Sequence, residues 1–452
     1  MAELAQPLAA PRDDLGAATV GVERVPEAFR VLGFFDHFVL WADLGVGLLV
    51  LQAGSYLVPG LGLPQAIAAI LIGTLVGNLM LAFAGTIGAE HAVPSMVSLR
   101  PAFGLRGSYL PSLINVVQLI GWGAFEIVIM ANASATLSGP ILGHGSYPLW
   151  VFVWGAVAVL LGLGGPLVVV RQWLEKIGIW LVLVTVAWMG IYALGHGNLG
   201  AIWARPGDGS TSFGQGIDLV VAMPISWLPL VADFNRFARD PRVSFAGTFS
   251  GFAVSNALCY LLGVLLVLSL PAGDLIGSIM TVAFGGWGLA LLLGDETDNA
   301  FADIYSSAIS VKNVIPSLPT RWLVAGLGAV CLGIALTVDL RDFQGFLILV
   351  GSLFTPLFGV LFADRYLVRR RRYTDEELYP TAPDTTTARL WGLNPIALIA
   401  WGAGLATFLA ETTYVGWLGG TLPSLAVSLV VYVALSRLPQ AVRRLRGITS
   451  AG

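Results

Sequence analysis

The sequence predicts an all-α polytopic membrane protein with about twelve transmembrane helices. Three observations predict this fold: the composition, the number of long apolar segments, and the placement of the basic residues. Only 11% of the 452 residues are charged and 56% are hydrophobic, whereas a soluble domain carries about 25% charged residues. The 55 glycines also suit membrane helices, because small residues let helix backbones approach closely.

Twelve apolar segments are long enough to cross the hydrocarbon core of a bilayer. We expect helices, because an open sheet cannot satisfy its backbone polar groups in lipid and no alternating barrel pattern is present. The expected spans are 33–59, 63–88, 111–138, 148–165, 173–195, 214–236, 245–270, 285–311, 321–339, 343–364, 392–410 and 415–436. The expected regions are a tail (1–32), a ten-helix core (33–364), a basic loop (365–391), helices 11 and 12 (392–436) and a basic tail (437–452).

The basic residues predict the orientation of the chain. With a cytoplasmic N-terminus, all but Arg205 and Arg341 of the 24 Lys and Arg residues fall on the cytoplasmic side. This distribution follows the positive-inside rule and places both termini in the cytoplasm of a cell-membrane protein. The run of arginines at 369–372 is expected to face lipid head groups or to set topology, rather than to bind nucleic acid.

Two of the expected spans contain helix-breaking residues. Span one holds the glycine-rich stretch "LWADLGVGLL", and span six holds "AMPISWLPLVADF" with Pro224 and Pro229 around Ser226 and Trp227. Each proline removes a backbone donor and clashes with the preceding turn. Broken helices at corresponding places in two halves are typical of an inverted-repeat transporter with its site at the membrane midplane. The alternative is that these are ordinary packing kinks.

The third span carries a polar stripe. Gln118, Trp122 and Glu126 are spaced i, i+4, i+8 and therefore lie on one helical face. An amide, an indole and a carboxylate together suit a planar heterocycle, which needs a ring to stack on and hydrogen-bonding groups at its edge. A Glu inside a span costs roughly 2.5–3.5 kcal/mol, so it usually faces a cavity or a partner. The alternative is that Glu126 pairs with another helix for structure and Trp122 fills the core.

The eighth span places acids where a membrane helix should cross. The stretch "LLLGDETDNAFADIYSSAIS" contains Asp295, Glu296, Asp298 and Asp303, with Asn299 on the face of Asp295 and Asp303. Four such acids buried alone would cost roughly 10 kcal/mol. Since no Lys or Arg lies in the interior of a span, a small cation or a proton is the expected partner. The alternative is that Asp295 and Glu296 border an aqueous vestibule and have no specific role.

Spans one to ten resemble the purine–cytosine permease family, the nucleobase–cation symporters. The resemblance rests on "FFDHFVLWADLGVGLLVLQAGSYLVP", on the block from "GNLMLAFAGTIGAEHAVPSM" through "RPAFGLRGS" to "QLIGWGAFE", on "SWLPLVADFNRFARD" and on "NAFADIYSSAIS". It covers residues 25–370. Within the family, the chain looks most similar to the hydroxymethylpyrimidine-transporter branch, which serves thiamine-precursor uptake.

The resemblance implies a leucine-transporter-type fold, with ten core helices in a five-plus-five inverted repeat and two more helices. It implies a substrate held between the tryptophans of spans three and six, and a sodium ion between spans one and eight. The substrate-binding residues it implies are Gln118, Trp122, Glu126, Ser226, Trp227 and Asp303. The cation-binding residues it implies are Leu44, Gly47, Asp295, Asp298 and Asn299, with sodium as the metal. Relatives commonly carry hydroxyl residues where this chain has Asp298 and Asn299, so a proton is the competing coupling ion.

The predicted function is secondary active import of a nucleobase-like nitrogen heterocycle, such as cytosine or a hydroxymethylpyrimidine-like thiamine precursor. The import would proceed by alternating access and would be driven by symport with Na+ or H+. The alternative is a proton- or sodium-coupled amino-acid transporter of the same fold. An enzyme is not expected, because the four histidines are scattered. The expected partners are the substrate, the coupling cation and the lipid bilayer, with no cofactor, nucleic acid or obligatory protein partner.

Overall fold

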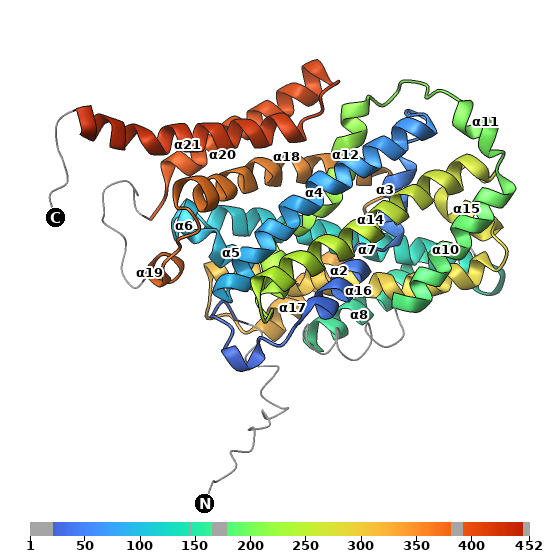
Figure 1. Cartoon of the computed structure of the whole chain (residues 1–452). Coiled ribbons are helices and arrows are strands. Elements are labelled where there is room, and N and C mark those ends of the chain that lie inside the picture. The colour runs from blue at the N-terminus through green and yellow to red at the C-terminus, as the bar shows by residue number, and fades with distance from the viewer. Residues whose placement is uncertain (1–20, 144–145, 165–178, 381–391, 446–452) are drawn as a thin grey trace, which may run out of the picture.

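The computed structural model describes residues 21–143, 146–164, 179–380 and 392–445, with side chains up to residue 438. Within these ranges the regular elements are helices, and the β pairing there is one parallel bridge between Leu32 and Ala238. Figure 1 shows the long helices running roughly side by side. The expectation of an all-helical protein is therefore confirmed for the described residues.

The helices follow one another with short connections. The elements before residue 199 are η1 (Glu27–Phe29), α2 (Phe34–Asp43), α3 (Leu48–Ser55), α4 (Leu63–His91), α5 (Ser95–Ser98), α6 (Arg100–Phe103), α7 (Tyr109–Leu142), α8 (Tyr147–Gly164) and α10 (Ile179–His196). The elements after it are α11 (Leu199–Ala204), α12 (Phe213–Trp227), α13 (Val231–Asn235), α14 (Pro241–Ser269), α15 (Leu275–Thr281), α16 (Gly285–Val314), α17 (Thr320–Ala335), η3 (Leu340–Asp342), α18 (Phe343–Phe362), the π-helical turn η4 (Ala363–Val368), α19 (Asp375–Leu378), α20 (Pro395–Ala410), the π-helical turn η5 (Glu411–Val415) and α21 (Thr421–Leu445).

Both predicted helix breaks are present. In the first span, α2 ends at Asp43 and α3 starts at Leu48, with a bend of 59° between them. In the sixth span, α12 ends at Trp227 and α13 starts at Val231, so that Pro229 lies in the gap. Pro224 lies inside α12 and does not end it.

Six described helices are long and apolar enough to cross a membrane, or seven when the bent pair α2–α3 counts as one span. Three shorter apolar helices accompany them, at Tyr147–Leu163, Trp180–His196 and Thr320–Ala335. Apolar side chains such as Val117, Leu160 and Val184 are 63–69% exposed, as expected of a lipid-facing surface. The start of the predicted fifth span, residues 1–20 and 446–452 of the predicted tails, and residues 381–391 of the predicted basic loop lie outside the described residues. The total of twelve spans and the inverted repeat stay predictions.

Several predicted span boundaries differ from the structure by a few residues. The tenth span continues beyond residue 364 as the turn η4, so Arg365 is helical and fully buried beside Glu90, 2.5 Å away, instead of opening the basic loop. The eleventh and twelfth spans start later than predicted, at Pro395 and Thr421. Before α21, Gly416 and Gly419 adopt positive φ, a conformation that ends helices and that glycine tolerates.

Long helices enclose the two broken ones. α14 packs along both α2 and α3, α4 packs along both α12 and α13, and α16 packs against α7. Glycine makes these contacts close: a Cβ on Gly263 of α14 would lie 2.0 Å from the carbonyl oxygen of Leu51, and one on Gly77 of α4 would lie 2.2 Å from the ring of Pro224. Small residues at such contacts are typical of membrane helix packing. The breaks are therefore held inside the protein, away from lipid.

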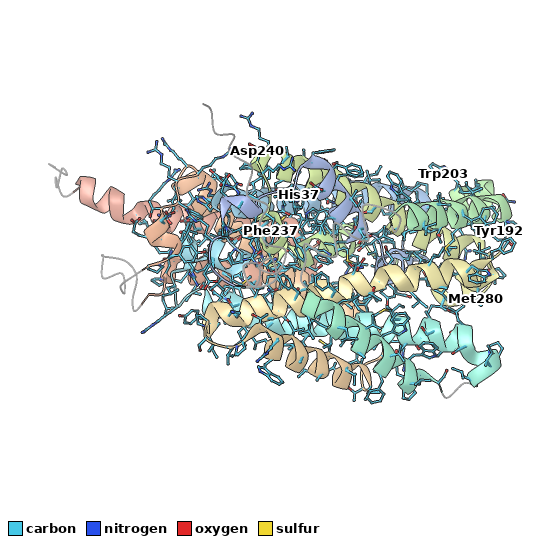
Figure 2. All side chains as sticks on the ribbon, turned by 90° about the horizontal axis from the view of Figure 1, so that it is seen from below. His37, Tyr192, Trp203, Phe237, Asp240 and Met280 are labelled. Atoms are coloured by element: carbon cyan, nitrogen blue, oxygen red, sulfur yellow. The ribbon has the colours of Figure 1, made fainter. Side chains whose placement is uncertain are left out.

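The two ends of the bundle carry different connections. In Figure 2, Tyr192, Trp203 and Met280 lie at one end, while Asp240 and Phe237 lie at the other. The predicted topology requires this separation, because the connections after spans five and seven should lie opposite the connection after span six. Which end faces the cytoplasm stays a prediction.

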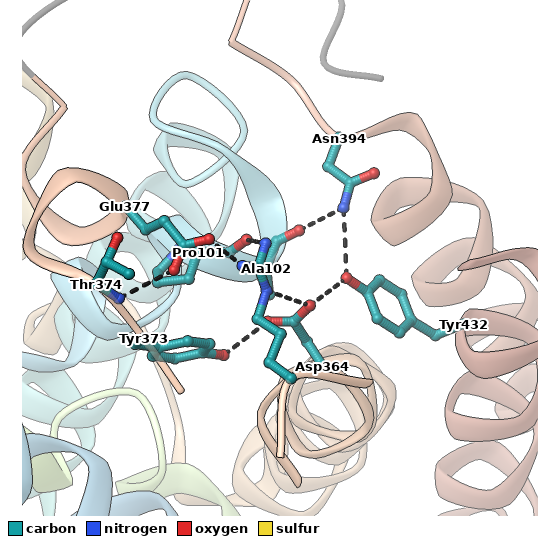
Figure 3. Close-up of polar contacts among 9 residues, drawn as sticks. Pro101, Ala102, Asp364, Tyr373, Thr374, Glu377, Asn394 and Tyr432 are labelled. Atoms are coloured by element: carbon teal, nitrogen blue, oxygen red, sulfur yellow. Dashed lines mark hydrogen bonds and ion pairs between the residues drawn. The ribbon is translucent and has the colours of Figure 1, made fainter. Parts of the chain in front are cut away.

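A buried carboxylate fastens α21 to the rest of the fold. Asp364 is 1% exposed and accepts hydrogen bonds from the hydroxyls of Tyr432 (2.6 Å) and Tyr373 (2.9 Å) and from Nε of Arg369 (3.1 Å). Figure 3 shows Tyr432 approaching Asp364 from the neighbouring helix. The amide of Asn394 joins the cluster by donating to the Tyr432 hydroxyl at 3.5 Å, and it also donates to the carbonyl of Ala102 at 2.6 Å. The Asp364 cluster thus connects segments that are far apart in sequence.

We expect Tyr432→Phe to destabilise the protein, because it removes a hydrogen bond to a buried carboxylate, a bond worth roughly 1.5–3 kcal/mol. The melting temperature of detergent-solubilised protein should fall. The matched control is Tyr414→Phe, since Tyr414 is 85% exposed. Equal melting temperatures for the two variants would contradict a structural role for the Asp364 cluster.

Candidate functional site

A small cavity lies between the two helix breaks. Its lining residues are Leu44, Leu49, Val50, Trp122, Glu126, Met223, Ser226, Trp227, Leu230, Glu296, Asn299 and Asp303. They come from the first broken helix, α7, the second broken helix and α16. A water-sized sphere has only ≈ 10 Å³ of room inside, about what one water molecule needs. A larger ligand therefore requires these side chains to move apart.

Most of the predicted site residues meet at this cavity. Of the predicted substrate residues, Trp122, Glu126, Ser226, Trp227 and Asp303 line it. Gln118 lies behind it, where Nε2 donates to the Ser226 carbonyl at 2.9 Å and to Oδ1 of Asn115 at 3.0 Å. Gln118 therefore ties α7 to the end of α12.

The two indoles of the cavity are held differently. Trp227 packs edge-on against Trp41 at a centroid distance of 6.0 Å, and the Trp41 indole N–H donates to Asn235 at 2.8 Å. Trp122 packs edge-on against Phe343 and Phe346 of α18, at 5.5 and 5.3 Å. Unlike Trp41, Trp122 has a buried indole nitrogen without a hydrogen-bond partner in the described structure. This donor is available to a bound molecule.

Glu296 is the residue that joins α16 to the first helix break. Its carboxylate is fully buried and accepts from the backbone N–H groups of Leu48 (2.6 Å) and Leu49 (3.3 Å). These groups open α3, where the first N–H groups have no intrahelical partner and the helix dipole favours negative charge. A Cβ on Gly47 would lie 3.1 Å from Oε2 of Glu296. Glycine at this position therefore keeps room for the carboxylate.

The same helix holds the other side of the break through Asn299. Its Nδ2 donates to the carbonyl of Val46 at 3.1 Å, while its Oδ1 is buried and has no partner in the described residues. From the sequence, Asn299 is a predicted cation-binding residue, whereas Glu296 is one of the acids expected to meet a cation or a proton, with a vestibule position as the alternative. The available signal was spacing: Glu296 stands three residues before Asn299 and seven before Asp303, on their helical face.

A second group of acids lies beside the cavity. Asp43, at the end of α2, lies beside Asp295, and Asp298 is near both carboxyl groups. In the same way the carboxyl groups of Glu126 and Glu296 lie beside each other. Two ionised carboxylates do not approach so closely without a proton or a cation between them. The first break is therefore a place that attracts positive charge.

The predicted cation residues divide between these two groups. Leu44 and Asn299 line the cavity, Gly47 lies at the break, and Asp295 and Asp298 belong to the acids beside Asp43. Buried oxygens without partners at Asp43, Asp295 and Asn299 are ligands that suit a hard cation. No group of three or more His, Cys, Asp or Glu side chains in the described ranges is arranged to hold a metal ion. The complete ligand set stays a prediction.

One end of the bundle beyond the cavity is covered by the N-terminal segment. Residues 21–33 run across it: Arg236 donates to the Gly21 carbonyl at 2.8 Å, Tyr379 donates to the Val22 carbonyl at 2.7 Å, and Leu32 donates to the Phe237 carbonyl at 3.0 Å. This is the end at which Figure 2 places Phe237 and Asp240. A passage from the cavity toward that end requires these contacts to separate.

Comparison with known proteins gives one consistent result. A family model described as "permease for cytosine/purines, uracil, thiamine, allantoin" matches residues 24–432. The chain is 27% identical over 385 residues to a cytosine permease of Escherichia coli, covering 83% of each chain. It is 24% identical over 415 residues to a hydantoin permease of Microbacterium maritypicum, covering 84% of this chain and 81% of that protein.

Two solved structures share the fold. One is a nucleobase-cation-symport-1 family transporter in a closed conformation with bromovinylhydantoin bound, with a TM-score of 0.80, 19% identity, and coverage of 94% of this chain and 96% of that chain. The other is a Na+-coupled sialic acid symporter, with a TM-score of 0.69, 12% identity, and coverage of 94% and 93%. At these identities the likeness shows the fold alone: the all-helical arrangement of the chain resembles that of both structures.

We expect Glu296→Gln to loosen the start of α3, because the amide turns an N–H group toward backbone N–H groups and leaves one of them unmatched. The cost should be roughly 1–3 kcal/mol. Hydrogen–deuterium exchange of residues 48–55 should speed up. The control is Thr297→Ala, since the Thr297 hydroxyl bonds only the Gly294 carbonyl of its own helix. Unchanged exchange in α3 of Glu296→Gln would rule out the capping role.

Proposed function

The chain belongs to the family of permeases for cytosine/purines, uracil, thiamine and allantoin, and from this premise we propose that it imports a nucleobase-like nitrogen heterocycle by cation symport. The substrate is cytosine or a hydroxymethylpyrimidine-like thiamine precursor, and the coupling ion is Na+ or H+. The observation that carries the proposal is the cavity between the breaks. It combines two indole rings, Trp122 and Trp227, with the carboxyl groups of Glu126 and Asp303.

These groups suit a flat heterocycle better than an aliphatic substrate. An indole offers a face on which an aromatic ring stacks, and a carboxylate accepts hydrogen bonds from ring and exocyclic N–H groups. Both functions are available at one place only because α7, α12 and α16 converge there. Alternating access then exposes the cavity to each side in turn, by movement of the helices around the breaks.

The alternative hypothesis, an amino-acid transporter of this fold, does not agree with the contacts at the first helix break. Such a carrier uses the N-terminus of a half-helix to hold the substrate carboxylate. Here the N–H groups of Leu48 and Leu49 already hold the carboxylate of Glu296. A free amino acid would have to displace a buried side chain, so we favour the heterocycle.

We expect Trp122→Ala and Trp227→Ala each to weaken substrate binding about tenfold or more, since an aromatic pair contributes roughly 0.5–1.5 kcal/mol beyond the area it buries. Uptake of radiolabelled cytosine and hydroxymethylpyrimidine into proteoliposomes measures the effect. Trp322→Ala is the control, because Trp322 is 68% exposed. Normal uptake by both cavity variants would place the substrate elsewhere.

We expect Asp298→Asn to change ion coupling, because it removes one formal charge from the acids beside Asp43. If Na+ is the partner, stimulation of uptake by Na+ should weaken while some substrate binding survives. If a proton is the partner, the variant should exchange substrate across the membrane without concentrating it. Uptake and counterflow across Na+ concentration and pH distinguish the two. Concentrative uptake with unchanged ion dependence would remove Asp298 from the coupling mechanism.

A further inference from the structure

The ionisable residues that line the cavity are all acids. Three of its lining residues are acids, Glu126, Glu296 and Asp303, and the lining contains no Lys, Arg or His. Its unmatched hydrogen-bonding atoms are also mostly acceptors. Oε2 of Glu126 and Oδ1 of Asn299 are buried without partners in the described structure, and the indole N–H of Trp122 is the one such donor that lines the cavity. A ligand that satisfies these atoms must bring more donors than acceptors.

The cavity also borders a helix N-terminus, a source of positive potential, but a carboxylate of the protein already occupies it. The N-terminus of α3 is the feature that would attract an anion, and Glu296 neutralises it at 2.6 Å from the Leu48 nitrogen. An anionic ligand would therefore meet carboxylates without a compensating positive group. The site discriminates against negative charge by its construction.

None of the titratable groups that face Glu126 in the described structure carries a positive charge. From α16 it is faced by Glu296, Asp303 and Asp295. Cys259 of α14 stands near Glu296, and Cys331 of α17 stands near Asp303. The lining residues of α3 and α12 are not titratable. Within the described residues, positive charge at Glu126 must therefore arrive with a ligand, an ion or a proton.

We propose that the substrate binds as a cation, as an amino-substituted nitrogen heterocycle protonated on the ring nitrogen beside its exocyclic amine. These two N–H groups point the same way and donate in parallel to the carboxylate of Glu126, as a guanidinium does to a carboxylate. One of them meets Oε2, which has no partner in the described structure, and the other takes the place of the neighbouring Glu296 carboxyl. The ring lies against Trp122. The inference rests on the proposed function and specifies the charge of the substrate: each molecule carries its own positive charge through the membrane.

The chemistry of the class follows from this geometry. A 4-aminopyrimidine or a related amidine offers the required pair of donors after protonation. A 4-oxopyrimidine presents a carbonyl oxygen to Glu126 at the same position, so an acceptor faces an acceptor. A mismatch of this kind at a site built for hydrogen bonding discriminates strongly, because buried polar groups are left unpaired.

The test measures ligand affinity against pH at constant Na+, using the purified full chain in detergent and isothermal titration calorimetry. The probes are two 4-aminopyrimidines whose ring nitrogens have different pKa values, an N-methylated aminopyrimidinium with a permanent charge, the matching 4-oxopyrimidine and a pyrimidine carboxylate. We expect the affinity of each amine to rise as the pH falls and to level off near that ligand's own pKa. The affinity of the permanent cation should not change with pH, and it should lie between the low-pH and high-pH affinities of the amines. The oxo and carboxylate ligands should bind at least tenfold more weakly than the amines do at low pH.

Glu126→Gln should reduce the preference for amino over oxo ligands at least tenfold, whereas Glu376→Gln, at an exposed position, should leave it unchanged. If both amines show the same midpoint, the titrating group belongs to the protein and the inference is overturned. Equal affinities for amino and oxo ligands also overturn it, while the proposed function stands. Absence of binding by every pyrimidine at every pH overturns both.

Discussion

The interaction on which the rest of the structure depends is the contact between the Glu296 carboxylate and the first N–H groups of α3. A helix that stops and restarts at membrane depth exposes backbone donors where no bulk water is present to satisfy them. One carboxylate from α16 satisfies two of these donors. The contact then requires glycine at position 47, a polar partner for Val46 at position 299, and helices packed closely enough to keep lipid away.

The helix that supplies this carboxylate also reaches the end of the bundle covered by residues 21–33. There, Tyr305 of α16 accepts from Arg236 at 3.1 Å, and Asn313 accepts from Nη2 of Arg100 at 2.7 Å. α16 therefore carries acids at its centre and partners for buried arginines toward one end. A displacement of α16 changes the cavity and these end contacts together, which gives the fold a physical link between occupancy of the site and closure of that end.

Composition and helix-breaking residues were sufficient to predict the class of fold and the two breaks. The i, i+4 spacing predicts that Trp122 and Glu126 share one face of α7, and that Asn299 and Asp303 share one face of α16. Spacing along one helix does not say which neighbour each face meets, so it could not predict that all four residues line one cavity or that Glu296 contacts the start of α3. The Asp364 cluster was equally out of reach, because it joins residues 364 and 432 through tertiary packing.

The separation of 248 residues between Leu48 and Glu296 has a consequence for biosynthesis. At about 5–20 residues per second, a ribosome needs roughly 12–50 s to reach Glu296 after it has made Leu48. During that interval the start of α3 lacks its native partner, although α2 and α3 have already emerged. The first span is therefore made before the carboxylate that satisfies the opening N–H groups of α3 in the finished fold, so its final broken geometry depends on a helix synthesised much later.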